Sequence, residues 1–194
     1  MNAPRNTKEN EAIESIENFL KNQTVFIGPD PEIMADHGLA PRTAREEMLL
    51  DRNWNRDRVG LLRDRLVSNC NENWEVLSAI ASSPGAKWGD CITGIWTASG
   101  DLAVVSTGGV LAFASITHYA LRHIMKYWRD EPSIGVNEGD AFMHNDARWG
   151  SIHPADFSTF MPVFFDGELV CWVGCSEHLG ENGAIEPGGL SAMA

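Results

Sequence analysis

The sequence has 194 residues, of which 43% are hydrophobic, enough for one domain with a sizeable core. It carries 27 acidic and 15 basic residues, a formal net charge of −12, so a nucleic acid or an anionic membrane surface is not expected as a partner. The sequence contains neither a run of 18 apolar residues nor the apolar core of a signal peptide. We therefore expect a cytoplasmic protein.

Two kinds of segment are expected before residue 43. Apolar residues recur at helical spacing over residues 11–21, which predicts a short amphipathic helix. Residues 27–41 contain three prolines and predict an extended connection. We therefore expect residues 1–42 to form an N-terminal helix and extended arm, and residues 43–194 to form the main domain.

Helices are predicted from capping residues and apolar spacing. Thr43 and Glu46 have the spacing of a capping box, so a helix should begin at residue 44. Apolar residues advance by three or four over residues 56–82, as on one face of a long helix. The same spacing predicts a second long helix over residues 110–128.

Two hairpins are predicted, over residues 90–107 and 157–175. In the second, Asp166 and Gly167 form the pair that a tight primed turn favours. Both of its strands are apolar at nearly every position, so we expect this hairpin to be covered on both faces. The fold class is therefore α+β, with long helices packed on a mixed or antiparallel sheet built from hairpins.

A histidine and an aspartate three residues apart, His153 and Asp156, precede the first strand of this hairpin. If residue 165 faces residue 168, Asp156 faces Glu177, and His178 returns beside the turn. Two imidazoles and a carboxylate suit Mn, Fe or Zn, with coordination positions left open. The alternative is structural: His153 caps a loop, Asp156 accepts backbone amides, and His178 binds no metal. A bulge at Pro162 would shift the register and move His178 off the site.

Residues 138–189 carry a series of motifs in a fixed order. These are Gly139-Asp140, Asn145-Asp146, His-Pro-Ala-Asp at 153–156, Pro162-Val-Phe followed by Asp-Gly-Glu-Leu, His178, and Gly183-Ala-x-x-Pro-Gly. The set resembles the hydantoinase B / 5-oxoprolinase family, most closely the metal-binding subunits of the acetone and acetophenone carboxylases. With the upstream helices and hairpin, the resemblance covers roughly residues 45–194.

The resemblance implies a divalent metal, manganese or alternatively zinc or iron, held by His153, Asp156 and His178. It implies that the metal acts as a Lewis acid toward the oxygen of a ketone that is carboxylated with bicarbonate. Neighbouring side chains are candidates for catalytic or proton-transfer roles, with turn capping or salt bridging as the alternative: His144, Asn145, Asp146 and Glu177.

The resemblance also implies partner subunits. The sequence contains no G-x-x-x-x-G-K-[ST] loop, and the family places ATP hydrolysis on a different, hydantoinase-A-like subunit. The family's metal-binding subunits are several times longer than this chain. We therefore expect a subunit of a hetero-oligomer, or a portion of one, that is incomplete without further chain and inactive in isolation.

Three functions follow from these expectations. The first is the metal-binding part of an ATP-dependent ketone carboxylase acting on acetone or an aryl ketone. The second is a subunit of an ATP-dependent ring-opening amidohydrolase, although such relatives tend to show His-Leu-Pro-Asp and a double histidine, where this chain has His-Pro-Ala-Asp and a single His178. The third is a non-catalytic assembly piece. An iron oxygenase also uses two histidines and a carboxylate, but the resemblance points elsewhere.

Overall fold

The structure is a computed structural model that describes residues 29–180 together with residue 14. The helix predicted over residues 11–21 therefore lies outside the described residues, apart from residue 14. Within residues 29–180, no helix is both long and apolar enough to cross a bilayer. The helical segments are α2 Pro31–Ala35, α3 Ala44–Leu50, α4 Arg56–Ile80, α5 Pro84–Lys87, α6 Leu111–Ile116, α7 His118–His123, the π-helical turn η2 Ile124–Trp128 and the 3-10 turn η3 Ala147–Trp149.

Five antiparallel strands form one sheet, in the order β2-β1-β5-β4-β3. The two predicted hairpins are β1–β2 and β4–β5, and they lie side by side because β1 pairs with β5. The predicted α+β class is confirmed, and the sheet is antiparallel rather than mixed. The strands are β1 Cys91–Thr97, β2 Leu102–Val105, β3 Phe142–His144, β4 Asp156–Phe165 and β5 Glu168–His178.

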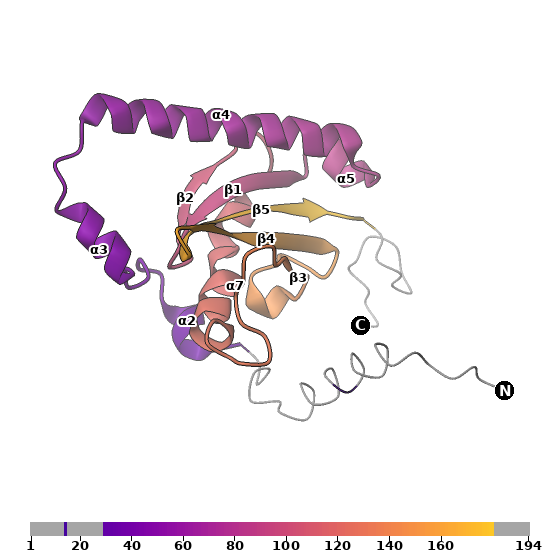
Figure 1. Ribbon diagram of the computed structural model, residues 1–194. Helices are drawn as coiled ribbons and strands as arrows, with labels where there is room; N and C mark the ends of the chain where they lie inside the picture. The colour runs from indigo at the N-terminus through magenta and orange to yellow at the C-terminus, as the bar shows by residue number, and fades with distance from the viewer. Residues whose placement is uncertain (1–13, 15–28, 181–194) are drawn as a thin grey trace.

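The long helix α4 lies along the β2–β1 side of the sheet (Figure 1). Polar side chains fix this contact: the Thr93 hydroxyl donates to the Cys70 carbonyl at 2.6 Å, and the Trp74 indole donates to the Cys91 carbonyl at 3.2 Å. The helix predicted over residues 56–82 is confirmed.

The main apolar core lies on the opposite face of the sheet. There Trp96 and Phe160 pack edge to face with ring centroids 5.2 Å apart, against Leu121 of α7 and Trp172 of β5. Adjacent strand residues point to opposite faces, so β1 presents Thr93 to α4 and Trp96 to this core. The sheet therefore separates α4 from α6 and α7.

The predicted helix over residues 110–128 consists of three pieces, α6, α7 and η2. Thr117 between α6 and α7 keeps right-handed helical angles, with φ −62° and ψ −24°, so the chain runs on without a turn. A π-helical turn then ends the segment at Trp128. The element exists as predicted, and its interior irregularities were not predicted.

The predicted extended connection over residues 27–41 contains a helix, α2. Pro31 is at the start of this helix, where a proline is tolerated because its missing amide hydrogen has no helical partner there. The Asp30 carboxylate accepts from the amides of Glu32 and Ile33, so it caps the helix. The expectation of extended backbone was wrong for residues 31–35.

The hairpin β4–β5 is covered fully on one face only. On the face toward the core Trp172 and Phe160 are buried, but on the other face Met161 and Val173 are 44% and 37% exposed. The predicted two-sided burial is wrong here because α4 packs mainly on β1 and β2.

Candidate metal centre

The structure brings His153, Asp156 and His178 together. The Asp156 Oδ1 atom lies 3.0 Å from Nδ1 of His178 and 3.6 Å from Nε2 of His153. The two imidazole rings meet edge to face with centroids 4.7 Å apart. One ligand atom from each residue lies within 4.8 Å of the others, which is close enough for a single ion to bind all three.

The strand register that forms this cluster differs from the predicted one. Next to the turn, Phe165 pairs with Glu168 as expected, but the register shifts between Val163 and Phe164. Beyond this bulge Asp156 pairs with His178 rather than with Glu177. A bulge was expected to move His178 away from the site, and instead it places His178 directly across from Asp156.

Asp156 is held in place by the turn that precedes it. Its side chain is 1% exposed, and Oδ2 accepts from the amides of Ile152 at 3.1 Å and His153 at 3.0 Å. The other oxygen, Oδ1, is directed toward the two histidines. The backbone amides and the candidate ion therefore use different oxygens of the same carboxylate, so the structural role predicted for Asp156 does not exclude its role as a metal ligand.

The cluster has the donors and the access that a borderline divalent ion needs. Two imidazole nitrogens and one carboxylate oxygen are a donor set for Mn, Fe or Zn. The histidine side chains are 20% and 19% exposed, so the cluster is not sealed by protein. His178 also lines an open hollow of about 580 Å³ between residues 82–85 and 178–180. The residues present fit a metal with open coordination positions.

Asn145 and Asp146 make structural contacts in this region. The Asn145 side-chain amide donates to the Pro154 carbonyl at 2.8 Å, so it ties the end of β3 to the His153–Asp156 turn. Asp146 caps η3 and forms an ion pair with Arg148. The hydrogen bonds from Arg148 lower the pKa of the Asp146 carboxyl below its ordinary value.

Glu177 lies on the other face of the sheet. It pairs with Phe157 of β4 and with Cys91 of β1, one residue out of step with the Asp156–His178 pair. Neighbouring positions along a strand point to opposite faces, so its side chain is directed away from the cluster. Partial burial raises the pKa of its carboxyl.

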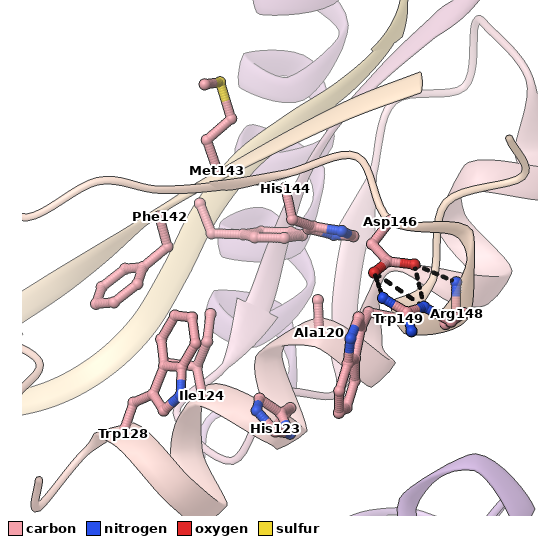
Figure 2. Close-up of a pocket in the computed structure, with 11 residues that line it drawn as sticks. Ala120, His123, Ile124, Trp128, Phe142, Met143, His144, Asp146, Arg148 and Trp149 are labelled. Atoms are coloured by element: carbon pink, nitrogen blue, oxygen red, sulfur yellow. Dashed lines mark hydrogen bonds and ion pairs between the residues drawn. The ribbon is translucent and has the colours of Figure 1, made fainter. Parts of the chain in front are cut away.

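His144 lines a cavity that the sequence did not predict. The cavity has a volume of about 400 Å³ and lies between β3, α7 and η3 (Figure 2). Its ring is stacked on Phe160 with centroids 6.1 Å apart, and burial lowers the pKa of the imidazole to about 4. The alternation of Phe142 and His144 on a short strand was the available signal, but it did not reveal what packs opposite.

The comparisons with known proteins agree with this architecture. A family model described as Hydantoinase B/oxoprolinase matches residues 57–194. The chain belongs to this family. The resemblance inferred from the motifs is thereby confirmed.

This chain is similar to subunits of two carboxylases and of a caprolactamase. It is 31% identical over 148 residues to the acetone carboxylase alpha subunit of Xanthobacter autotrophicus, covering 76% of this chain and 18% of that protein. It is 38% identical over 106 residues to the acetophenone carboxylase delta subunit of Aromatoleum aromaticum, covering 55% and 15%. It is 36% identical over 75 residues to the caprolactamase subunit beta of Pseudomonas jessenii, covering 39% and 12%.

A solved structure is similar over most of the chain. The nucleotide-free structure of an acetone carboxylase, from work on ATP-dependent acetone carboxylation, matches with a TM-score of 0.62 and 31% identity. The match covers 69% of this chain and 18% of the carboxylase chain. The hydantoinase-B-like chain therefore spans less than a fifth of the length of the carboxylase subunits that it matches.

Proposed function

We propose that this chain is the metal-binding part of an ATP-dependent carboxylase that joins bicarbonate-derived carbon to a ketone. The observation that carries the proposal is the convergence of His153, Asp156 and His178 on one point beside an open hollow. The similarity to the alpha subunit of acetone carboxylase and to the delta subunit of acetophenone carboxylase supports the ketone as substrate class.

In this proposal the three residues of the cluster hold a divalent ion. The ion would supply Lewis acidity to a carbonyl oxygen of the substrate. Asp156 supplies the negative charge of the site, and the amides of Ile152 and His153 fix its orientation. Asn145 acts as a positioning residue, since it holds the Pro154 carbonyl within the same turn.

Asp146 and Glu177 are not part of the cluster. Asp146 is engaged with Arg148 beside the cavity that His144 lines, so we propose a role in shaping that cavity. Glu177 is on the opposite face from the cluster, and we propose no proton transfer through it.

Nucleotide chemistry is assigned to a partner. The sequence lacks a Walker loop, so we propose that a hydantoinase-A-like subunit hydrolyses ATP and that this chain functions only in a hetero-oligomer. The relatives are themselves named as alpha, delta and beta subunits, which supports assembly with other chains.

The test is an assay on the complex that purifies with this chain. Labelled bicarbonate is supplied with ATP and either acetone or acetophenone, and fixed label is counted in the acid-stable product. Incorporation that requires both ATP and ketone supports the carboxylase. A matched complex carrying His153→Ala should lose the incorporation, whereas His118→Ala, at a residue outside the cluster, should keep it.

A ring-opening amidohydrolase is the second candidate, because this chain is 36% identical to a caprolactamase subunit over 75 residues, which are 39% of the chain. The same complex is incubated with ATP and a lactam or cyclic imide, without bicarbonate. Ring opening under those conditions, with no fixation of label on ketones, would select the amidohydrolase. A complex inactive in both assays would favour a non-catalytic assembly role.

A further inference from the structure

An open groove lies on the face of the sheet that carries α4. The helix packs mainly on β1 and β2, and in Figure 1 the strands β5, β4 and β3 follow in order away from it. The half of this face that β5, β4 and β3 form carries exposed side chains within the described part of the chain. This half-sheet is the floor of the groove, and the flank of α4 that is directed over β5 is its wall.

The floor of the groove is uncharged. Val173 of β5 pairs with Met161 of β4, and both side chains are exposed on this face. One row further along, Cys175 pairs with Thr159, which in turn pairs with the exposed Met143 of β3. Side chains at two-residue spacing share one face of a strand, so these five side chains lie together.

The wall of the groove is a stripe of α4 residues spaced by four and three in turn. An α-helix has 3.6 residues per turn, so residues at this spacing lie on one flank, as in the seam of a coiled coil. Val76 and Ile80 of the stripe are 50% and 75% exposed, and no member of the stripe carries a charge. The stripe consists of Leu62, Leu66, Asn69, Asn73, Val76 and Ile80.

The contacts of α4 show where this stripe is directed. Cys70 is buried against the sheet, and its carbonyl accepts from Thr93 of β1. The Asn71 side chain accepts from Thr107, which follows β2 in the chain. The stripe and Asn71 lie on opposite flanks of the helix, roughly 180° apart around its axis. Since Asn71 is directed over the β2 side, the stripe is directed over β5.

The groove differs in charge from the surface beside it. The sequence carries 27 acidic and 15 basic residues, yet none of them belongs to the floor or the stripe. The outward flank of α4, by contrast, carries Arg58, Arg65 and Glu72, which are all exposed. An uncharged centre with charge at its rim is typical of a protein interface. The occupant should therefore cover the stripe and leave the outward flank in water.

The dimensions of the groove select its occupant. Leu62 and Ile80 are about five helical turns, or 27 Å, apart. A single helix of that length, packed about 8–10 Å from the axis of α4, would lie on the floor and against the stripe. The helix predicted over residues 11–21 is too short to do so. Residues 181–194 contain Pro187, Gly188 and Gly189, which oppose a long helix.

A second copy of this chain does not fit the groove. If two α4 stripes paired antiparallel, the sheet of the second copy would lie where β4 and β5 of the first already are. If they paired in parallel, the second sheet would cover the outward flank of α4. Burial of Arg58, Arg65 and Glu72 beneath an uncharged sheet is unfavourable.

We infer that a helix of a different chain occupies this groove, from the chain that completes the hydantoinase-B-like subunit. This chain spans less than a fifth of the carboxylase subunits that it matches, so the family has much further sequence that can supply such a helix. The occupant has a broad uncharged face toward the stripe and the floor. It has acidic residues beside Arg58 and Arg65 and a basic residue beside Glu72. The inference rests on the proposed assembly with other chains.

The experiment introduces the photo-crosslinking amino acid benzoylphenylalanine into the full-length chain, within the complex that purifies with it. It replaces Val76 in the wall or Val173 in the floor, and the control replaces Leu61, which is exposed on another flank of α4. After irradiation, mass spectrometry identifies the peptide joined at each position. Positions 76 and 173 should be joined to one helix of a different chain with the stated charge pattern. Position 61 should not be joined to that helix.

Val76→Asp tests the groove by disruption. The residue is half exposed, so the variant should fold, which circular dichroism checks. Association with the partner chain, measured by sedimentation of the reconstituted complex, should weaken at least about tenfold. Leu61→Asp is the matched control and should change it by less than about twofold. Reversal of charge at Arg58 and Arg65, both to Glu, should also weaken association, and added salt should diminish that effect.

Three results would overturn the inference: crosslinks from positions 76 and 173 to a second copy, crosslinks to residues 1–28 or 181–194 of the same chain, or equal association of Val76→Asp and Leu61→Asp. Its failure is distinguishable from failure of the proposed function. A complex that carboxylates no ketone but joins both positions to one partner helix would leave the groove assignment standing. A complex that carboxylates ketones without such crosslinks would contradict the groove assignment alone.

Discussion

Asp156 and His178 face each other across the β4–β5 ladder, with Oδ1 and Nδ1 3.0 Å apart. They meet because β5 accommodates one additional residue, Val170, where the register shifts. Without that bulge Asp156 would pair with Glu177, whose side chain would then occupy this face. A local irregularity of one strand thus determines which side chains form the candidate metal centre.

Asn145→Ala should weaken metal binding without removing a ligand. Its side-chain amide restrains the Pro154 carbonyl, and loss of groups that position metal ligands typically lowers metal affinity by about tenfold or more. Competition with a coloured chelator measures the change. Asn137→Ala is the control, because Asn137 bonds to Asp140 in an exposed loop. Equal affinities of the two variants would contradict the positioning role.

Arg122→Ala should destabilise the fold by about 3 kcal/mol or more. The Arg122 guanidinium is 8% exposed, and it bonds to Asp101 at 2.5 Å and to the Gly38 carbonyl at 2.6 Å. Removal of the cation leaves the buried Asp101 carboxylate without an opposite charge and removes the hydrogen bonds to the Asp36 and Gly38 carbonyls. Urea denaturation measures the free energy of unfolding. Arg129→Ala, at an exposed ion pair, should change it by less than about 0.5 kcal/mol.

His144 should make the fold less stable as the pH falls from 7 to 5. Its pKa is lowered from 6.5 to about 4 by burial, so in this range the unfolded state binds a proton that the folded state excludes. The stability is therefore fully present above pH 6.5 and is lost toward pH 4, with about 2 kcal/mol of the loss falling between pH 7 and pH 5. His144→Phe should remove this part of the pH dependence. Denaturation at pH 7 and at pH 5 measures the free energy of unfolding of both proteins. An equal decrease in that free energy for wild type and His144→Phe would contradict the prediction.

Gly150→Ala should be far more destabilising than Gly139→Ala. Both glycines have positive φ, 107° and 91°, but a Cβ at Gly150 would lie 2.3 Å from the Ile116 carbonyl oxygen, whereas a Cβ at Gly139 meets nothing within 4 Å. We expect about 1 kcal/mol for Gly139→Ala and about 3 kcal/mol or more for Gly150→Ala. Thermal unfolding of the two variants measures the difference, and similar melting temperatures would contradict the close backbone approach.

The elements that depend on neighbouring residues were predictable from the sequence. The capping box at Thr43 and Glu46 forms as expected, with both reciprocal hydrogen bonds. Asp166 and Gly167 both adopt positive φ, as the primed turn requires. These features depend on bonds within a few residues, so the local sequence contains the information that specifies them.

The features that depend on distant packing were not predictable. The strand order, with β1 and β3 on either side of the hairpin, depends on pairings between residues far apart in the sequence. The three residues of the candidate metal centre were predicted to converge from their types and spacing, and they do, but the predicted strand register was wrong by one residue. The setting of His144 depends on α7, which lies across the cavity and about twenty residues earlier in the chain. Spacing along β3 alone could not reveal that contact.

The central claim is tested most directly by the metal content of the complex that purifies with this chain, measured by elemental mass spectrometry. Wild-type protein and the His118→Ala control should each contain about one divalent ion per chain. Asp156→Asn keeps the shape of a fully buried side chain, and His178→Ala removes an imidazole; both should reduce the metal to a small fraction. A wild-type complex without metal, or variants that retain it fully, would contradict the assignment of these residues as ligands.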